Sequence, residues 1–129
     1  MEESIITVGD GYSPLALAFL GDAVFEIYVR EHLLKQANSS VDSLHRKAVK
    51  YVKASAQCEA FERIEPHLSE KELRIFKRGR NAKSNSKAKN AALSEYKKAT
   101  GFETLLGYLH INENFERLNE LLEIAADFE

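Results

Sequence analysis

The stretch SPLALAFLGDAVFEIYVREHLLK, residues 13–35, decides the fold. Ser13 provides a capping hydroxyl, and Pro14 stands at the first helical position, where its missing N–H costs nothing. A helix is therefore expected from Pro14 to about Lys35. Its apolar residues surround most of the circumference instead of forming one stripe. We expect this helix to be buried on several sides.

The segment that follows predicts two more helices. After a turn at residues 38–40, a long helix should run from about Val41 until Pro66 ends it. Ser69 with Glu72 three residues later has the pattern of a capping box, which predicts a short helix through Phe76. The basic residues after it are expected to form a loop or frayed helix.

The C-terminal third predicts two helices with apolar residues at helical spacing. One should begin near Ala91 or Ser94 and continue to His110, and the last should begin at about Asn114. The residues expected to face inward are Phe102, Leu105, Leu106, Leu109, Phe115, Leu118, Leu121, Leu122 and Ala125. No segment alternates as a strand should. The predicted fold class is all-α, with one domain over residues 1–129.

Composition indicates a globular protein of the cytoplasm. A chain of 129 residues with 44% hydrophobic residues can bury one core. Its single cysteine, Cys58, has no partner for an internal disulfide and is expected to be a small buried side chain. The N-terminus lacks a secretory signal pattern, and the longest apolar run contains Asp22 and Glu26, so no membrane span is expected.

Positive charge is concentrated in one segment, KRGRNAKSNSKAKN, residues 77–90. It contains six of the 18 Lys and Arg residues and no acid, whereas the rest of the chain has 12 basic and 20 acidic residues. Such segregation is typical of a surface that contacts a polyanion. The alternative is a charged face in contact with solvent only.

Asp22 lies in the middle of the predicted first helix, directly after Gly21. A glycine inside a helix costs about 1 kcal/mol relative to alanine, and an unpaired buried carboxylate costs more. Both residues therefore need a compensating role. The structural alternative is that a lysine or arginine from another helix neutralises Asp22.

Glu103 has similar surroundings in the helix that ends near His110. Thr100, Glu103 and Gly107 form a stripe of small residues and one acid, so two helices crossing at Gly21 and Gly107 would bring Asp22 and Glu103 together. Two converging carboxylates repel unless a cation or a shared proton lies between them. Mg²⁺ fits, because it binds one or two carboxylates and keeps several waters.

Two motifs resemble the ribonuclease III family. The string LAFLGDAV, residues 17–24, is similar to the signature E-x-x-E-F-L-G-D-[SA]-V, and FETLLGYL, residues 102–109, is similar to D-x-x-E-A-L-[IL]-G. The strings FKRGRNAKSN (76–85) and GDAVFEIYVR (21–30) resemble the Mini-III branch, which has the catalytic domain without a double-stranded RNA-binding domain. The resemblance extends over nearly the whole chain.

The resemblance implies an Mg²⁺-dependent endoribonuclease with Asp22 and Glu103 as catalytic, metal-binding acids. It also implies a homodimer that cuts both strands of double-stranded RNA, leaving 5′-phosphate and 3′-hydroxyl ends. The Mini-III branch implies precursor 23S ribosomal RNA as the substrate. The excess apolar circumference of the first helix independently favours a symmetric dimer.

The sequence departs from the larger ribonucleases III at three positions. Leu15 and Ala18 stand where those enzymes have two glutamates, and Thr100 stands where they have an aspartate. Two acids can hold one Mg²⁺, but a two-metal site is not expected. Glu26, one turn after Asp22, either adds to the site or pairs with Arg30.

The basic segment suits double-stranded RNA, which is recognised mainly through phosphates and 2′-hydroxyls. It has polar donors but no aromatic residue for stacking on a base. The predicted RNA-binding residues are Lys77, Arg78, Arg80, Lys83 and Lys87. A stripe of Arg46, Lys50 and Lys53 either adds phosphate contacts or faces solvent.

Two alternatives follow from the same residues. One is a catalytically inactive ribonuclease III fold that binds structured RNA, because acids are missing at three positions. The other is a helical protein-interaction module whose basic segment meets an acidic partner.

Overall fold

A computed structural model of the chain describes residues 11–83 and 90–128. Its helices are α1 (Pro14–Gln36), α2 (Val41–Val52), α3 (Ala54–Ile64), α4 (Glu70–Arg80), α5 (Asn90–Ile111) and α6 (Phe115–Ala126), with a 3-10 turn, η2 (Glu65–His67), after α3. No strand occurs in the described ranges, which confirms the predicted all-α fold.

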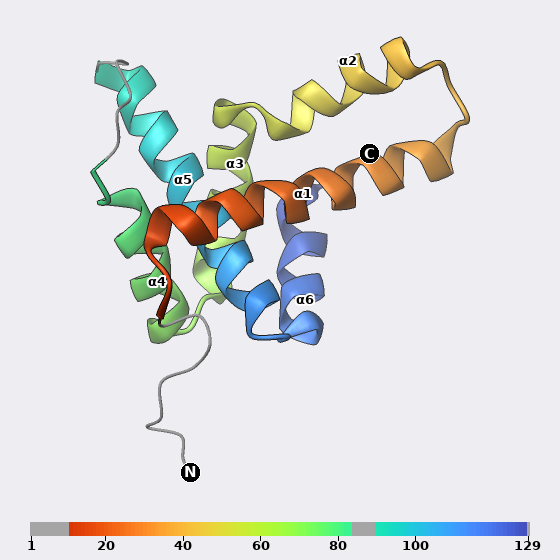
Figure 1. The fold of residues 1–129 in the computed structure, drawn as a ribbon. Coiled ribbons are helices and arrows are strands. Elements are labelled where there is room, and N and C mark those ends of the chain that lie inside the picture. The colour runs from red at the N-terminus through yellow and green to blue at the C-terminus, as the bar shows by residue number, and fades with distance from the viewer. Residues whose placement is uncertain (1–10, 84–89, 129) are drawn as a thin grey trace.

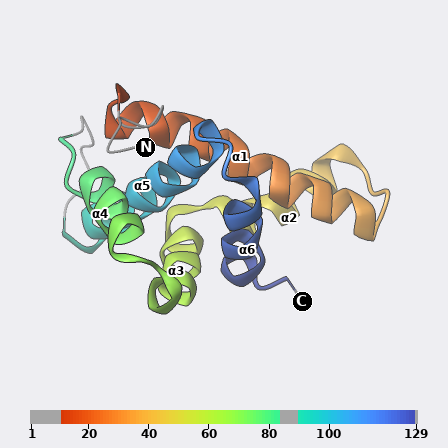
Figure 2. The same cartoon turned by 90° about the horizontal axis from the view of Figure 1, so that it is seen from below.

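Helix α5 is the centre of the arrangement. It packs against α1, α4 and α3, and α1 lies across it in both views of the ribbon (Figures 1 and 2). The C-terminal half of α1 and helix α2 run side by side away from the other helices (Figure 1). No helix within the described residues is both long and apolar enough to cross a lipid bilayer.

Helix α1 begins and ends as its sequence predicts. The Ser13 hydroxyl accepts a hydrogen bond from the backbone N–H of Ala16 at 3.1 Å, and Pro14 is the first helical residue. Its buried face includes Phe25, whose ring meets that of Phe102 on α5 edge-to-face with 5.3 Å between the centroids. The opposite face of α1 contains large apolar residues that stay exposed.

The predicted helix over 41–66 is wrong in one respect, because two helices occupy this range. Lys53 has extended backbone angles (φ −66°, ψ 156°) and separates α2 from α3. Any residue can adopt these angles, so no glycine or proline marks the break. The direction of the chain changes there, and the first turn of α3 approaches α5.

The helix predicted from Ser69 is confirmed, including its capping box. The Ser69 hydroxyl accepts from the Glu72 N–H at 3.1 Å, and the Glu72 carboxylate accepts from the Ser69 N–H at 2.9 Å. Helix α4 continues through Gly79 to Arg80, so the first part of the basic segment is helical instead of a loop. Residues 84–89 lie outside the described residues.

Most of the predicted core is confirmed. Cys58 is a buried free thiol, and among the residues expected inward on α5 and α6 only Phe115 is exposed. The Phe115 ring instead lies edge-to-face against His110 at 5.3 Å between centroids. It is the first residue of α6, where the helix has not yet reached the core.

Candidate active site

Helices α1 and α5 cross at two glycines, as their small residues predict. A Cβ added to Gly21 would overlap the backbone carbonyl of Glu103, and a Cβ added to Gly107 would overlap the backbone carbonyl of Leu17. The two backbones are therefore in direct contact, which only glycine permits at these positions. Asp22 and Glu103 belong to this crossing.

The crossing brings the carboxyl groups of Asp22 and Glu103 into contact. The pKa of Glu103 is raised from 4.5 to about 8. Burial is the largest cause, a hydrogen bond from Gln57 opposes it, and a hydrogen bond with Asp22 and the negative charges of Asp22 and Glu26 raise the pKa further. The raised pKa therefore comes mainly from burial, and the nearby carboxylate of Asp22 adds to it. The structure thus places the two predicted catalytic acids together.

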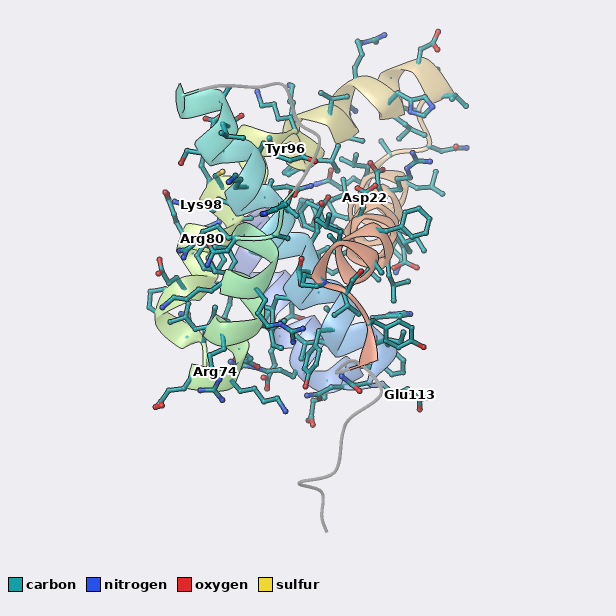
Figure 3. All side chains as sticks on the ribbon, turned by 60° about the vertical axis from the view of Figure 1, so that its left-hand side comes forward. Asp22, Arg74, Arg80, Tyr96, Lys98 and Glu113 are labelled. Carbon is teal, nitrogen blue, oxygen red and sulfur yellow. The ribbon has the colours of Figure 1, made fainter. Side chains whose placement is uncertain are left out.

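Asp22 is exposed, contrary to the expectation of a buried carboxylate. It lies on α1 at the edge of the contact with α5, where the other helices leave it open to solvent (Figure 3). Within residues 11–83 and 90–128, no lysine or arginine pairs with it. The alternative of a structural ion pair to a buried cation therefore finds no partner among the described residues.

Glu26 takes part in both interactions that its position allows. Its Oε1 accepts a hydrogen bond from Nε of Arg30 at 2.9 Å, one turn later on α1. Its charge also contributes to the raised pKa of Glu103. Glu26 is therefore close enough to influence the acid pair while it is held by Arg30.

Gln57, on the first turn of α3, was not identified from the sequence. Its side chain is buried (3% exposed), and its Nε2 donates to Oε2 of Glu103 at 3.2 Å and to the carbonyl of Val52 at 3.0 Å. Gln57 and Glu103 are 46 residues apart in the sequence, so no local sequence pattern predicts their contact. The contact arises from the break at Lys53.

The three positions without acids are occupied by residues that fit the packing. Ala18 and Thr100 are buried, and the Thr100 hydroxyl donates to the carbonyl of Tyr96 at 2.9 Å. Leu15 is exposed on α1. In the part of the chain that the structure describes, no group of three or more acids, histidines or cysteines has the geometry of a metal site.

This donor set fits Mg²⁺ with an incomplete protein shell. Asp22 and Glu103 offer two hard carboxylate oxygens side by side, and Glu103 holds a proton at neutral pH that a divalent cation would replace. Mg²⁺ tolerates such a site because it keeps several waters. The open side at Asp22 leaves room for a phosphate group of a ligand.

The predicted RNA-binding residues lie on and after α4. Lys77 and Arg78 are exposed on the helix, and Lys83 is exposed after it; Lys87 lies outside the described residues. Arg80 is half-buried, with Nε donating to Oδ1 of Asn81 at 3.0 Å and the guanidinium 5.7 Å from the centre of the Phe76 ring. Lys77 and Arg78 line one hollow on α4, whereas Arg80 lines another between α4 and α5.

Two basic residues of α5 join this surface and were not predicted. Lys97 and Lys98 line a shallow hollow together with Arg80 and Asn81. In Figure 3, Arg80 and Lys98 lie near one another at one side of the view, and Asp22 lies on α1 at the other. The two lysines follow the basic segment 77–90 by about two turns of α5, so basic residues that continue this pattern were present in the sequence.

Comparisons with known proteins identify the family. Residues 15–114 match the family described as the Ribonuclease III domain. The Mini-ribonuclease 3 of Thermoanaerobacter sp. is 51% identical over 114 residues, which cover 88% of this chain and 80% of the relative. That of Clostridium tetani is 46% identical over 116 residues, covering 89% and 77%.

A solved structure agrees with these relatives. The crystal structure of a Fusobacterium nucleatum protein superposes with a TM-score of 0.78 at 31% identity, covering 88% of this chain and 91% of that one. Both Asp22 and Glu103 lie within the segment that matches the family.

Proposed function

This chain belongs to the ribonuclease III family, in its Mini-ribonuclease 3 branch, and is an endoribonuclease; we propose that it cleaves double-stranded RNA with Mg²⁺ held by Asp22 and Glu103. The observation that supports this most is the contact of the two carboxyl groups at the glycine crossing. Their mutual repulsion favours a divalent cation over an empty pair. The proposal covers one catalytic domain over residues 1–129.

Each acid has a distinct part in this proposal. Asp22 is exposed, so it meets both the cation and the solvent side from which RNA approaches. Glu103 is held by Gln57 and gives up its proton when the cation binds. When bound, Mg²⁺ would neutralise phosphate charge and activate a water for attack on the phosphodiester.

RNA binding is assigned to the basic surface of Lys77, Arg78, Arg80, Lys83 and Lys87. Lys77, Arg78 and Lys83 are exposed and can reach phosphate oxygens, and Lys97 adds a positive charge on α5, beside Lys98, which pairs with Glu62 at 3.6 Å. Contacts of this kind follow the backbone of a duplex and do not discriminate between bases. This supports a double-stranded substrate, and the proposed natural one is precursor 23S ribosomal RNA.

A homodimer is supported by the outer face of α1. Four large apolar residues lie there at helical spacing and are exposed: Leu15 (38%), Phe19 (84%), Ile27 (65%) and Leu34 (53%). A stripe that runs the length of one straight helix is self-complementary about a two-fold axis, so a second copy can cover it with the same residues. We therefore propose two chains and two acid pairs per molecule, acting in the cytoplasm.

Cleavage of a synthetic RNA duplex, with Mg²⁺ and with excess EDTA, tests the proposal. We expect fragments with 5′-phosphate and 3′-hydroxyl ends only when Mg²⁺ is present. Binding without cleavage under both conditions would instead identify an inactive RNA-binding scaffold, and absence of binding would favour a protein-interaction module. Sedimentation at micromolar concentration should report two chains; Phe19→Ser should give monomers that no longer cut both strands.

A further inference from the structure

Gln57 is a buried polar residue whose side chain contacts the acid pair. Only 3% of the residue is exposed, and its amide nitrogen has two partners: Oε2 of Glu103 at 3.2 Å and the backbone carbonyl of Val52 at 3.0 Å. It is therefore in contact with a proposed metal ligand without being an acid itself.

The orientation of the Gln57 amide follows from its partners. Both Glu103 and Val52 present oxygen acceptors, so the NH₂ end must face them, and a flipped amide would set its oxygen against theirs. In this orientation Oε1 of Gln57 is buried without a hydrogen-bond partner in the described structure. A buried acceptor without a partner is unfavourable. The hydrogen bonds that Nε2 donates to Glu103 and Val52 must therefore outweigh the cost of leaving Oε1 unpaired.

The break between α2 and α3 holds Gln57 in place. The backbone N–H of Gln57 donates to the carbonyl of Lys53 at 3.0 Å, which starts α3. The carbonyl of Val52 would accept from residue 56 in a continuous helix, but the extended Lys53 releases it, and the Gln57 amide takes that position. The hydrogen bond to Val52 therefore fixes Nε2 of Gln57, the same atom that donates to Glu103.

We propose that Gln57 is a positioning residue for the metal ligand Glu103, holding its Oε2 so that the carboxyl group is presented to the divalent cation in one orientation. This inference rests on the proposed function of Asp22 and Glu103. A free glutamate has three rotatable bonds, and fixing one carboxylate oxygen reduces the ordering that cation binding requires. Hydrogen-bond partners of metal ligands typically change metal affinity by about 10- to 100-fold.

The test compares the same substitution at the two glutamines of the chain. Gln57→Met keeps the length of the side chain and removes both donors, and Gln36→Met is the matched control at an exposed position near the end of α1. Cation binding is measured without RNA, by titrating Mn²⁺ or Mg²⁺ into each protein by electron paramagnetic resonance or calorimetry. We expect Gln57→Met to bind the cation at least about 10-fold more weakly and Gln36→Met to equal the parent.

Cleavage kinetics add a second readout. If Gln57 acts on cation binding, Gln57→Met should need more Mg²⁺ for half-maximal cleavage and should recover most of its rate at saturating Mg²⁺. A folded Gln57→Met protein with unchanged cation affinity would overturn the inference. If in the same experiment the parent binds the cation and Asp22→Asn does not, the unchanged affinity of Gln57→Met overturns only the role of Gln57. If the parent itself binds no cation, the proposed function is overturned as well.

A measurement on the unaltered protein covers the case in which Gln57→Met does not fold. Selective ¹⁵N labelling of glutamine gives two side-chain amides, those of Gln36 and Gln57. Addition of Mg²⁺ should shift the Gln57 amide signals and leave those of Gln36 in place. Equal or absent shifts of the two, under conditions where the cation is bound, would contradict the inference.

Discussion

Two helix crossings on α5 depend on glycine, but they place opposite charges at the surface. At the α1–α5 crossing, Gly21 lies against the backbone of Glu103, and the acids on both helices meet. At the α4–α5 crossing, Gly79 lies against Thr104 and Gly101, and Lys77 and Arg78 next to it are exposed. The same close packing therefore concentrates negative charge at one crossing and spreads positive charge at the other.

The acid pair and the basic surface therefore differ in their effect on folding stability. Contact between the acids opposes folding unless a cation or a proton compensates it, and without a cation the proton on Glu103 fills this role at neutral pH. The exposed cations near α4 cost little, because water screens them. We infer that the acid pair is kept for chemistry and the basic surface for binding.

The largest expected effect is on stability, from substitution at the α1–α5 crossing. Gly21→Ala sets a Cβ against the Glu103 carbonyl, and backbone cannot rotate away, so we expect a loss of about 3 kcal/mol or more in the free energy of unfolding. A Cβ at Gly79 would overlap both Oγ1 and Cβ of the buried Thr104, so Gly79→Ala should also be destabilising, but less so because it overlaps no backbone carbonyl. Denaturant unfolding curves measure the free energy of unfolding of each variant and so test this order of stability losses.

Gly11→Ala is the control for these substitutions, because nothing lies within 4 Å of its added Cβ. Its stability should equal that of the parent. Equal stability losses for Gly21→Ala and Gly11→Ala would show that α1 and α5 do not cross at Gly21.

A smaller effect is expected in the pH dependence of stability. Because the pKa of Glu103 is about 8 in the folded protein and 4.5 ordinarily, the folded chain binds a proton more tightly. This group's stabilisation is complete below about pH 4.5 and is lost as the pH rises toward about 8. Melting temperatures in EDTA should therefore fall over this range, and Mg²⁺ should reverse the fall.

Glu103→Gln isolates the contribution of Glu103 to this pH dependence, because it removes the titrating carboxyl group and keeps the size of the side chain. The variant should show a flatter dependence of melting temperature on pH in EDTA. If its curve paralleled that of the parent, Glu103 would not be the group responsible.

The sequence predicts most helices and the acidic crossing for a physical reason. Capping residues and 3.6-residue spacing are local, and a glycine beside an acid inside an apolar helix indicates a close approach on its own. The crossing partner Gly107 could be paired with Gly21 because both helices had the same unusual pattern.

The features that were missed depend on contacts between distant segments. The break at Lys53 uses backbone angles open to any residue, and Gln57 reaches Glu103 only because of that break. The exposure of Asp22 follows from which faces of α1 the other helices cover. None of these can be read from spacing along the chain.

The smallest expected effect concerns the basic surface. Replacing Arg78, Arg80, Lys83 and Lys87 by alanine should weaken RNA binding, and each lost phosphate contact should reduce the slope of log affinity against log salt by about 0.9 or less. Binding is measured in EDTA so that no cleavage occurs. Thermal melts should stay close to those of the parent, because Arg78 and Lys83 are exposed and Arg80 is only half-buried. An unchanged salt slope would show that the replaced residues do not contact phosphates.

The most direct test of the acid pair is Asp22→Asn, which keeps the shape of the side chain and removes its charge. Because the substitution relieves repulsion with Glu103, the melting temperature in EDTA should equal or exceed that of the parent, while Mg²⁺-dependent cleavage is abolished and RNA binding persists. Near-parental cleavage by Asp22→Asn would contradict the account. A large fall in melting temperature, corresponding to a loss on the order of 3–5 kcal/mol in the free energy of unfolding, would also contradict the account, because it would mean that Asp22 neutralises a structural cation.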